Sequence, residues 1–173
     1  MFDEVIREMI TSRNISPFGY LALISDTKMT IFLTYAEEDS CTYDLVWTIN
    51  FWDLRKLGIG KRIELIDFSP NCEEFIAYTN TGQLTLWSLK KQKFLRCVHT
   101  FRKLKQTPIT QLRSFSNNTK CVAFSKQNNL LMLVDLTSTS QTQPILIRPE
   151  GDGFGDVLSF QIDQSELFLI CTF

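Results

Sequence analysis

Acidic residues are missing from the middle of the chain. None lies between Phe75 and Val134, a stretch that carries ten lysines and arginines. The flanks are acidic, with thirteen Asp or Glu against seven Lys or Arg in residues 1–74, and six against one in residues 135–173. The net charge is only −1, so no overall charge attracts nucleic acid or a membrane surface. The distribution therefore predicts a local basic island between acidic flanks.

The residues that catalysis and metal binding require are also scarce. His99 is the only histidine, and the five cysteines are widely separated, with no C-x-x-C pair. A zinc-type site needs several close His, Cys or carboxylate ligands, and a serine hydrolase of the elbow type needs G-x-S-x-G. The glycines of Gly58–Lys61 and Gly151–Asp156 do not match a phosphate or dinucleotide loop in spacing or context. We therefore predict no catalytic residue, no metal and no cofactor, and hence a protein that is not an enzyme.

Long hydrophobic runs are absent as well. The apolar runs fall far short of the roughly 20 residues that span a bilayer, and charged residues interrupt the first ten positions where a secretory signal would lie. Unpaired cysteines fit reduced thiols. We therefore predict a cytoplasmic protein without a transmembrane segment. A hydrophobic content of 44%, with 12% aromatic residues and only seven Gly and five Pro, predicts a packed globular domain.

An internal repeat of about 47 residues is the strongest pattern in the chain. Two series of apolar residues recur at 47-residue steps: Phe68, Phe115 and Ile162, and Phe75, Val122 and Leu169. Each unit alternates short apolar strands with Asn- or Gly-containing turns, such as Thr79-Asn-Thr-Gly82, which is typical of antiparallel hairpins. Four such strands per unit correspond to one propeller blade. We predict an all-β fold: an incomplete β-propeller of four-stranded antiparallel blades, with about three and a half blades.

The whole chain, residues 1–173, is predicted to form one partial propeller. Its blades are expected at about 4–54, about 62–101, about 109–148 and, as a half blade, 157–173. Closed propellers have roughly four to eight blades, and a blade cannot bury its apolar faces alone. We therefore expect further blades, either from a longer chain, which we favour, or from another subunit.

The first blade fits the pattern least well. Residues Leu21–Phe32 align with Phe75–Trp87 at an offset of about 54. This alignment predicts an acidic loop over Ala36–Asp44 and a fourth strand over Val46–Leu54. Residues Glu4–Ile10 are predicted as an outlying first strand, with a helical turn as the alternative.

This organisation resembles the WD-repeat family over nearly all of the chain. The resemblance is carried by Asp67-Phe-Ser-Pro70, Asn80-Thr-Gly82, Leu86-Trp-Ser-Leu89 and Leu133-Val-Asp-Leu136, which are similar to that family's turn and strand-end motifs. The Gly-His pair of the family is missing, so the repeats are divergent. The one literal Trp-Asp dipeptide, Trp52-Asp53, falls on the predicted fourth strand instead of the third, and we interpret it as a coincidence.

The resemblance implies a non-catalytic scaffold that binds other proteins in a multisubunit assembly. The amino-terminal propellers of large membrane-trafficking tethers and of the anaphase-promoting complex's fourth subunit look similar. The basic island supplies the candidate binding residues: we predict Lys90, Lys91 and Lys93 in the turn before one strand, Arg96 on that strand, and Arg102, Lys103 and Lys105 in the loop after it. The alternative function is binding of an anionic ligand through residues 90–105, either an anionic lipid headgroup such as a phosphoinositide or RNA, although nucleic acid is not the favoured partner.

Overall fold

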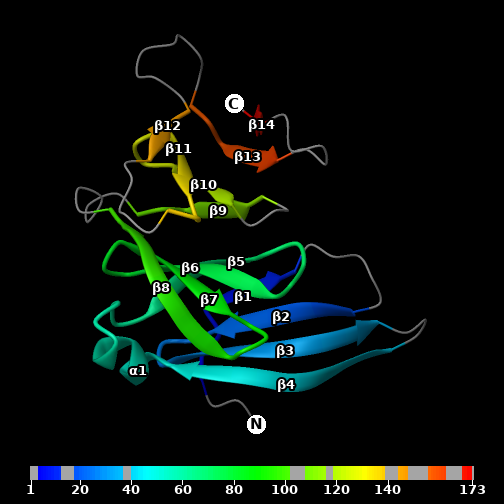
Figure 1. The fold of residues 1–173 in the computed structure, drawn as a ribbon. Helices are drawn as coiled ribbons and strands as arrows, with labels where there is room; N and C mark the ends of the chain where they lie inside the picture. The colour runs from blue at the N-terminus through cyan, green and yellow to red at the C-terminus, as the bar shows by residue number, and fades with distance from the viewer. Residues whose placement is uncertain are drawn as a thin grey trace.

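The structure is a computed structural model that describes residues 4–12, 18–36, 40–101, 108–115, 119–138, 144–147, 156–162 and 169–172. Over these residues the fold is an incomplete propeller built of β-strands, with one short helix (Figure 1). Within these ranges the strands form three four-stranded antiparallel sheets and one two-stranded sheet, each in sequence order. No helix among these residues is long and apolar enough to cross a membrane.

The strands follow one another as four successive blades. Blade 1 contains β1 (Glu8–Thr11), β2 (Phe18–Ile24), β3 (Lys28–Ala36) and β4 (Cys41–Asn50), followed by helix α1 (Phe51–Lys56). Blade 2 contains β5 (Ile63–Phe68), β6 (Glu74–Thr79), β7 (Gln83–Ser88) and β8 (Lys93–Thr100). Blade 3 contains β9 (Gln111–Ser114), β10 (Lys120–Ser125), β11 (Leu130–Asp135) and β12 (Ile145–Leu146). The described part of blade 4 contains β13 (Ser159–Ile162) and β14 (Leu169–Thr172).

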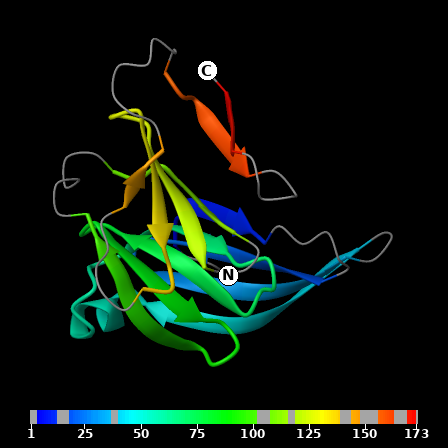
Figure 2. The same ribbon diagram turned by 45° about the horizontal axis from the view of Figure 1, so that its top comes forward.

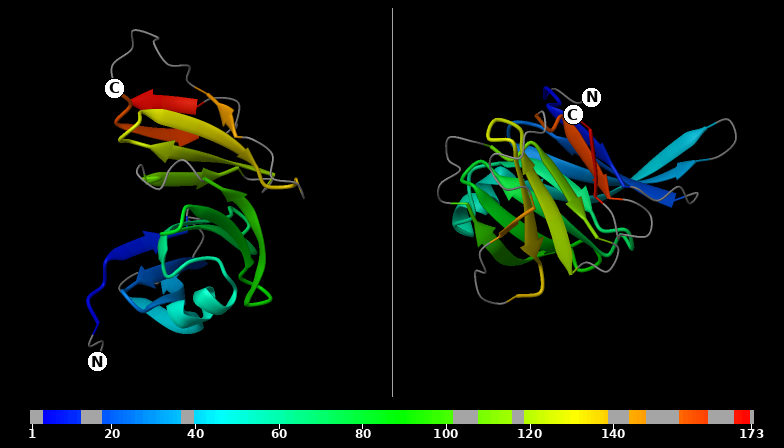
Figure 3. Two further views of the ribbon diagram at one scale, coloured as in Figure 1. Left: turned by 90° about the vertical axis from the view of Figure 1, so that its left-hand side faces the viewer. Right: turned by 90° about the horizontal axis from the view of Figure 1, so that it is seen from above.

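The blades are stacked in chain order, and their first strands lie next to one another. Strand β1 contacts β5, β5 contacts β9, and β9 contacts β13. Figure 1 shows the sheets rising from β2–β4 at the bottom to β13 and β14 at the top, and Figure 2 shows the strand direction turning from sheet to sheet. The side view in Figure 3 shows blades 1 and 2 facing each other, with blades 3 and 4 beyond. The first strands therefore form the inner side of the arc, as in a propeller.

An apolar core fills each gap between neighbouring blades. Ala22, Ile24, Met29 and Ile31 of blade 1 pack with Phe75, Ala77 and Trp87 of blade 2. Alternate residues of blade 2 form a second core with blade 3, and alternate residues of blade 3 form a third core with blade 4. Because side chains on a strand alternate between the two faces of a sheet, both faces of a middle blade are apolar. This explains the nearly continuous apolar runs in β6 and β10.

The register of the strands refines the 47-residue repeat. Phe68 lies opposite Phe75 in blade 2, and Ser114 lies opposite Cys121 in blade 3, which is a step of 46 residues for this hairpin. Phe75 faces blade 1 and Cys121 faces blade 2, whereas Val122 faces blade 4. The third strands of blades 2 and 3, β7 and β11, do begin 47 residues apart. The extra residue lies in the turn from Ser125 to Leu130, which is one residue longer than the turn from Thr79 to Gln83.

The first strand predicted within Glu4–Ile10 is present as β1, at Glu8–Thr11, and it lies on the inner side against β5. Blade 1 differs from the sequence-based expectations in two other respects. Residues 41–44, predicted to lie in an acidic loop, belong to β4, which pairs with β3 as far as Cys41 opposite Ala36. The predicted fourth strand over Val46–Leu54 ends at Asn50 and is replaced by α1 from Phe51 onward.

Helix α1 forms because, in a helix, its two apolar residues are buried together while its charges suit the two helix ends. Phe51 and Leu54, three residues apart, are both buried against the core between blades 1 and 2. Asp53 lies in the first turn, and Arg55 and Lys56 lie in the last turn, where their charges complement the helix dipole. Trp52-Asp53 therefore lies on a helix and not on the predicted fourth strand.

Candidate functional site: a groove between blades 1 and 2

A groove of about 340 Å³ lies where the end of β4, helix α1 and the beginning of β8 meet. Blade 1 contributes Trp47, Thr48 and Ile49 from β4 and Asp53, Leu54 and Leu57 from α1 and its end; blade 2 contributes Trp87, Gln92, Lys93 and Phe94. Leu54 and Trp87 are fully buried, whereas Trp47 and Phe94 are half-buried. Leu57 is 48% exposed, so an apolar side chain lies open to solvent beside an apolar lining.

The aromatic side of the groove is held rigidly. Trp87 stacks on Phe75, with the ring centroids 5.9 Å apart and the planes at 6°. Trp47 and Phe94 pack edge-on against Trp87, at centroid distances of 5.8 and 5.2 Å. The indole N–H of Trp87 donates a 2.9 Å hydrogen bond to the Thr85 hydroxyl. Each of these edge-to-face contacts contributes about 0.5–1.5 kcal/mol beyond burial, so the aromatic side keeps one shape.

A turn between β7 and β8 places lysines next to this groove. Gln92 adopts a left-handed backbone conformation with φ of 48°, and its side-chain amide donates a 3.0 Å hydrogen bond to the backbone carbonyl of Val46 on β4. The Lys91 backbone N–H donates to the Ser88 hydroxyl at 3.2 Å. Both bonds fix the turn, and the bond to Val46 also ties it to the neighbouring blade.

The predicted basic residues have different surroundings. Lys90 lies 3.5 Å from the Glu73 carboxylate, and both side chains are well exposed. Lys91 and Lys93 are exposed and form no ion pair with any residue that the structure describes. Arg96 donates hydrogen bonds to the backbone carbonyls of Leu136 and Ser138, so its guanidinium group joins blade 2 to blade 3.

The other end of the predicted basic surface is not described. Arg102, Lys103 and Lys105 lie outside the described residues. The structure therefore brings together Lys90, Lys91 and Lys93 at one end of β8, and it places Arg96 between blades.

Helix α1 adds a second exposed apolar residue near the groove. Trp52 is 63% exposed, and the Arg55 guanidinium lies 5.6 Å from its ring centroid. Asp53, the carboxylate in the groove lining, accepts a 3.1 Å hydrogen bond from Lys56. The negative charge of Asp53 is thus partly compensated within the helix.

A second hollow, of about 380 Å³, lies on the inner side of the arc between β1, β5 and β9. Next to it, Asp67 on β5 accepts hydrogen bonds from the backbone N–H and hydroxyl of Ser114 on β9, at 2.7 and 2.6 Å. Arg113 lies 3.3 Å from the other carboxylate oxygen of Asp67. Because the Asp67 side chain is only 4% exposed, these contacts connect blades 2 and 3 and do not present a carboxylate to a ligand.

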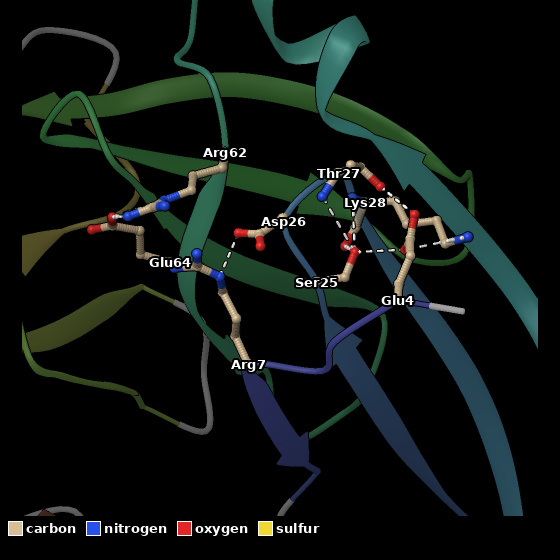
Figure 4. Close-up of polar contacts among 8 residues, drawn as sticks. All are labelled: Glu4, Arg7, Ser25, Asp26, Thr27, Lys28, Arg62 and Glu64. Atoms are coloured by element: carbon tan, nitrogen blue, oxygen red, sulfur yellow. Dashed lines mark hydrogen bonds and ion pairs between the residues drawn. The ribbon is translucent and has the colours of Figure 1, made fainter. Parts of the chain in front are cut away.

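A cluster of charged side chains surrounds the turn between β2 and β3 (Figure 4). Glu4 accepts hydrogen bonds from the hydroxyls of Thr27 and Ser25, at 2.6 and 2.9 Å, and lies 3.5 Å from Lys28. These hydroxyl hydrogen bonds, together with the Lys28 charge, hold the pKa of Glu4 below its ordinary value.

Two further ion pairs lie in the same region, between Arg7 and Asp26 and between Arg62 and Glu64. Each charge of this cluster has a partner of opposite sign. The cluster therefore attaches the first residues to blade 1 and is not a charged binding surface.

No metal centre is formed by the described residues, since they contain no group of three or more His, Cys, Asp or Glu side chains arranged to hold an ion. His99 lies on β8, with its ring 4.6 Å from that of Phe101. Cys121 is fully buried, and this burial raises the pKa of its thiol far above its ordinary value. A thiol in this state is a structural residue and not a nucleophile.

The fold is shared with solved structures. A protein from Lactobacillus plantarum with a β-propeller-like fold superimposes with a TM-score of 0.62 and 15% sequence identity, over 97% of this chain. The match covers 48% of that protein, so this chain spans about half its length.

Comparison of this chain at the level of sequence gives no match. No protein-family description matches it, and no curated protein matches it. Since 414 chains of solved structure match the fold, and one fold hosts many functions, the likeness establishes an incomplete propeller and no activity.

Sequence reasoning found the lysines of the groove but not its apolar side. Trp47 and Phe94 come from two blades, and Leu57 follows helix α1, whose first residues were predicted as a strand. Their side chains meet only through the packing of blade 1 on blade 2. The available signal was that three aromatic residues, Trp47, Trp87 and Phe94, each lie close to a predicted turn.

Proposed function

We propose that this chain is a non-catalytic scaffold for protein–protein interaction, and that the groove between blades 1 and 2 is a binding surface. The observation that carries this proposal is the half-exposed Leu57 beside a rigid aromatic side, with Lys93 in the lining and Lys91 in the adjoining turn, neither of them ion-paired with a described residue. Interfaces are centred on such apolar anchors and rigid aromatic residues, surrounded by charged residues.

The propeller fold is consistent with this function. Propellers present turns and inter-blade surfaces on a stable frame, and the WD-repeat resemblance points to the same use. We further propose that the partners are proteins of a multisubunit assembly in the cytoplasm, such as a membrane-trafficking complex.

Affinity purification of the tagged chain from cell extract tests the scaffold proposal. The expected result is that specific proteins remain bound through washes at high ionic strength, because a buried apolar contact is not screened by salt. Recovery of the chain alone, as a monomer without partners, would contradict the proposal.

The alternative function is binding of a phosphoinositide or RNA by the basic turn. It is favoured by one observation, that Lys91 and Lys93 have no ion-pair partner among the described residues. The affinity of such binding falls steeply with added salt. The slope of log affinity against log salt concentration reflects the number of phosphates that the protein neutralises. If such binding exists, reversing Lys91 and Lys93 to Glu should abolish it.

A further inference from the structure

We propose, resting on the scaffold function above, that the groove binds an extended acidic peptide segment of a partner protein that carries one large apolar residue. The apolar residue enters between Trp47, Phe94 and Leu57, and the acidic residues next to it pair with Lys91 and Lys93. The lining of the groove, its charge and its rigidity each support this choice of partner.

The lining selects a single apolar side chain. At about 340 Å³, the groove lies near the lower end of the range for specific binding sites, roughly 300–1,000 Å³. Leu54 lies fully buried beneath it, and Trp47 and Phe94 contribute half-buried rings. This space suits one leucine-sized or phenylalanine-sized side chain with the adjoining backbone, and not a folded domain.

The charge next to the groove selects acidic neighbours for that side chain. Lys91 and Lys93 are exposed and have no ion-pair partner among the described residues. The nearby carboxylates already have other partners, since Asp53 in the groove lining pairs with Lys56 and Glu73 pairs with Lys90. Complementary charge increases the association rate and rejects basic partners.

The same observations favour a peptide over RNA. Single-stranded RNA binds by stacking its bases on exposed aromatic faces. Here Phe75 stacks on the Trp87 ring, and Trp47 and Phe94 pack against Trp87 in T-shaped contacts. Within the groove lining the well-exposed apolar side chain is the aliphatic Leu57, which offers a base nothing to stack on, and the exposed ring of Trp52 lies outside the lining beside the Arg55 guanidinium.

The two sides of the groove are fixed before any partner binds. The hydrogen bond from Gln92 to Val46 and the contact between Trp47 and Trp87 join blade 1 to blade 2 at this point. A site that needs no rearrangement loses less entropy on binding, which allows a short segment to bind measurably.

The test uses the full chain and a random peptide library displayed on phage. The expected result is enrichment of peptides that combine Asp or Glu with one large apolar residue. Synthetic versions of these peptides should bind the Leu57→Glu variant at least about tenfold more weakly than the unchanged chain. The reason is that replacing an apolar residue at the centre of an interface commonly lowers affinity by about tenfold or more. The Lys93→Glu variant should lose roughly three- to tenfold, as expected for a charged pair at the rim.

Two exposed residues provide matched controls. Trp52→Ala removes an apolar side chain from the same helix but outside the groove lining, and Lys126→Glu reverses a lysine in a turn of blade 3. Both variants should bind within about twofold of the unchanged chain. Circular dichroism of each variant confirms that it is folded, and Lys93→Glu, an exposed substitution, keeps the test decisive if Leu57→Glu misfolds.

Several results would overturn the proposal. One is that the unchanged chain enriches no peptides beyond those that the Leu57→Glu variant enriches. Another is that the enriched peptides are basic. A third is that an enriched peptide binds equally well after its own large apolar residue is replaced by serine. Tighter binding of a poly-uridine oligonucleotide or of phosphoinositide vesicles to the same lysines would also overturn it, in favour of the anionic ligand. If partner proteins are captured equally well by Leu57→Glu, the groove proposal fails while the scaffold function stands.

Discussion

Replacing Asp67 by alanine should destabilise the propeller more than any exposed carboxylate replacement, because Asp67 joins two blades from a buried position. Its side chain is 4% exposed and accepts two short hydrogen bonds from Ser114, with Arg113 at 3.3 Å. Removing the carboxylate leaves the Ser114 N–H and hydroxyl buried without this acceptor. Hydrogen bonds to a charged group contribute about 1.5–3 kcal/mol each, and breaking a buried pair costs about 3–5 kcal/mol.

Urea unfolding followed by tryptophan fluorescence measures this loss. With a slope of roughly 2 kcal/mol per molar urea, a loss of about 4 kcal/mol lowers the midpoint by about 2 M. Ser114→Ala should cost less, about 1–2 kcal/mol, because the backbone N–H of residue 114 keeps its acceptor. The double variant should lose less than the sum of the two single variants, since the two residues share one interaction.

Asp53→Ala is the matched control. Its carboxylate is 54% exposed and, among the residues that the structure describes, forms an ion pair with Lys56 alone, so the loss should stay within about 0.5 kcal/mol of zero. If Asp67→Ala costs no more than Asp53→Ala, or if the losses at Asp67 and Ser114 are additive, the contact between β5 and β9 does not hold the blades together.

Three further predictions follow from single residues. Gly82→Ala should lower the free energy of unfolding in urea by about 1–3 kcal/mol, and by more than Gly58→Ala does. Both glycines have positive φ, but a Cβ at Gly82 would lie only 3.1 Å from a backbone carbonyl oxygen, whereas the space around Gly58 is open. Because the pKa of Glu4 is lowered in the folded chain, its carboxylate stabilises the fold above its ordinary pKa, and this contribution is lost as the pH falls through the folded pKa. A Glu4→Gln variant should therefore be less stable than the unchanged chain at neutral pH and equally stable in acid. A stability difference independent of pH would contradict this. Iodoacetamide should modify the exposed Cys41 in the folded chain and reach the buried Cys121, whose pKa is raised, only after unfolding, as peptide mass spectrometry would show.

The sequence was sufficient for the propeller fold and for most of the strands. Alternating apolar residues and Asn- or Gly-containing turns, such as the turn at Gly82, follow from local rules, so they can be recognised without a structure. The 47-residue step concealed two separate values: the second strands of blades 2 and 3 lie 46 residues apart, and a longer turn before Leu130 adds one residue. The difference was not visible because Cys121 and the next residue, Val122, are both apolar, so either one fits the pattern. Local patterns do not say which of two neighbouring apolar residues faces which blade.

The groove could be predicted only in part. Lys91 and Lys93 were visible as part of a charge run, but their apolar neighbours depend on the change from β4 to α1. Val46–Leu54 is an apolar, aromatic-rich segment that fits either a strand or a short helix, and the burial of Phe51 and Leu54 against blade 2 decides between them. Arg96 likewise looked like a surface charge until its hydrogen bonds to blade 3 were visible.

The most direct test of the interaction account observes the three tryptophan indole N–H signals by NMR while an enriched acidic peptide is added. Trp47 lines the groove, Trp87 forms its fixed wall, and Trp52 lies on α1 outside the lining. The account predicts a large, saturable shift of the Trp47 signal, a smaller shift of Trp87, and almost no change of Trp52. Saturable binding that shifts only Trp52, or none of the three, would contradict the claim that partners bind between blades 1 and 2.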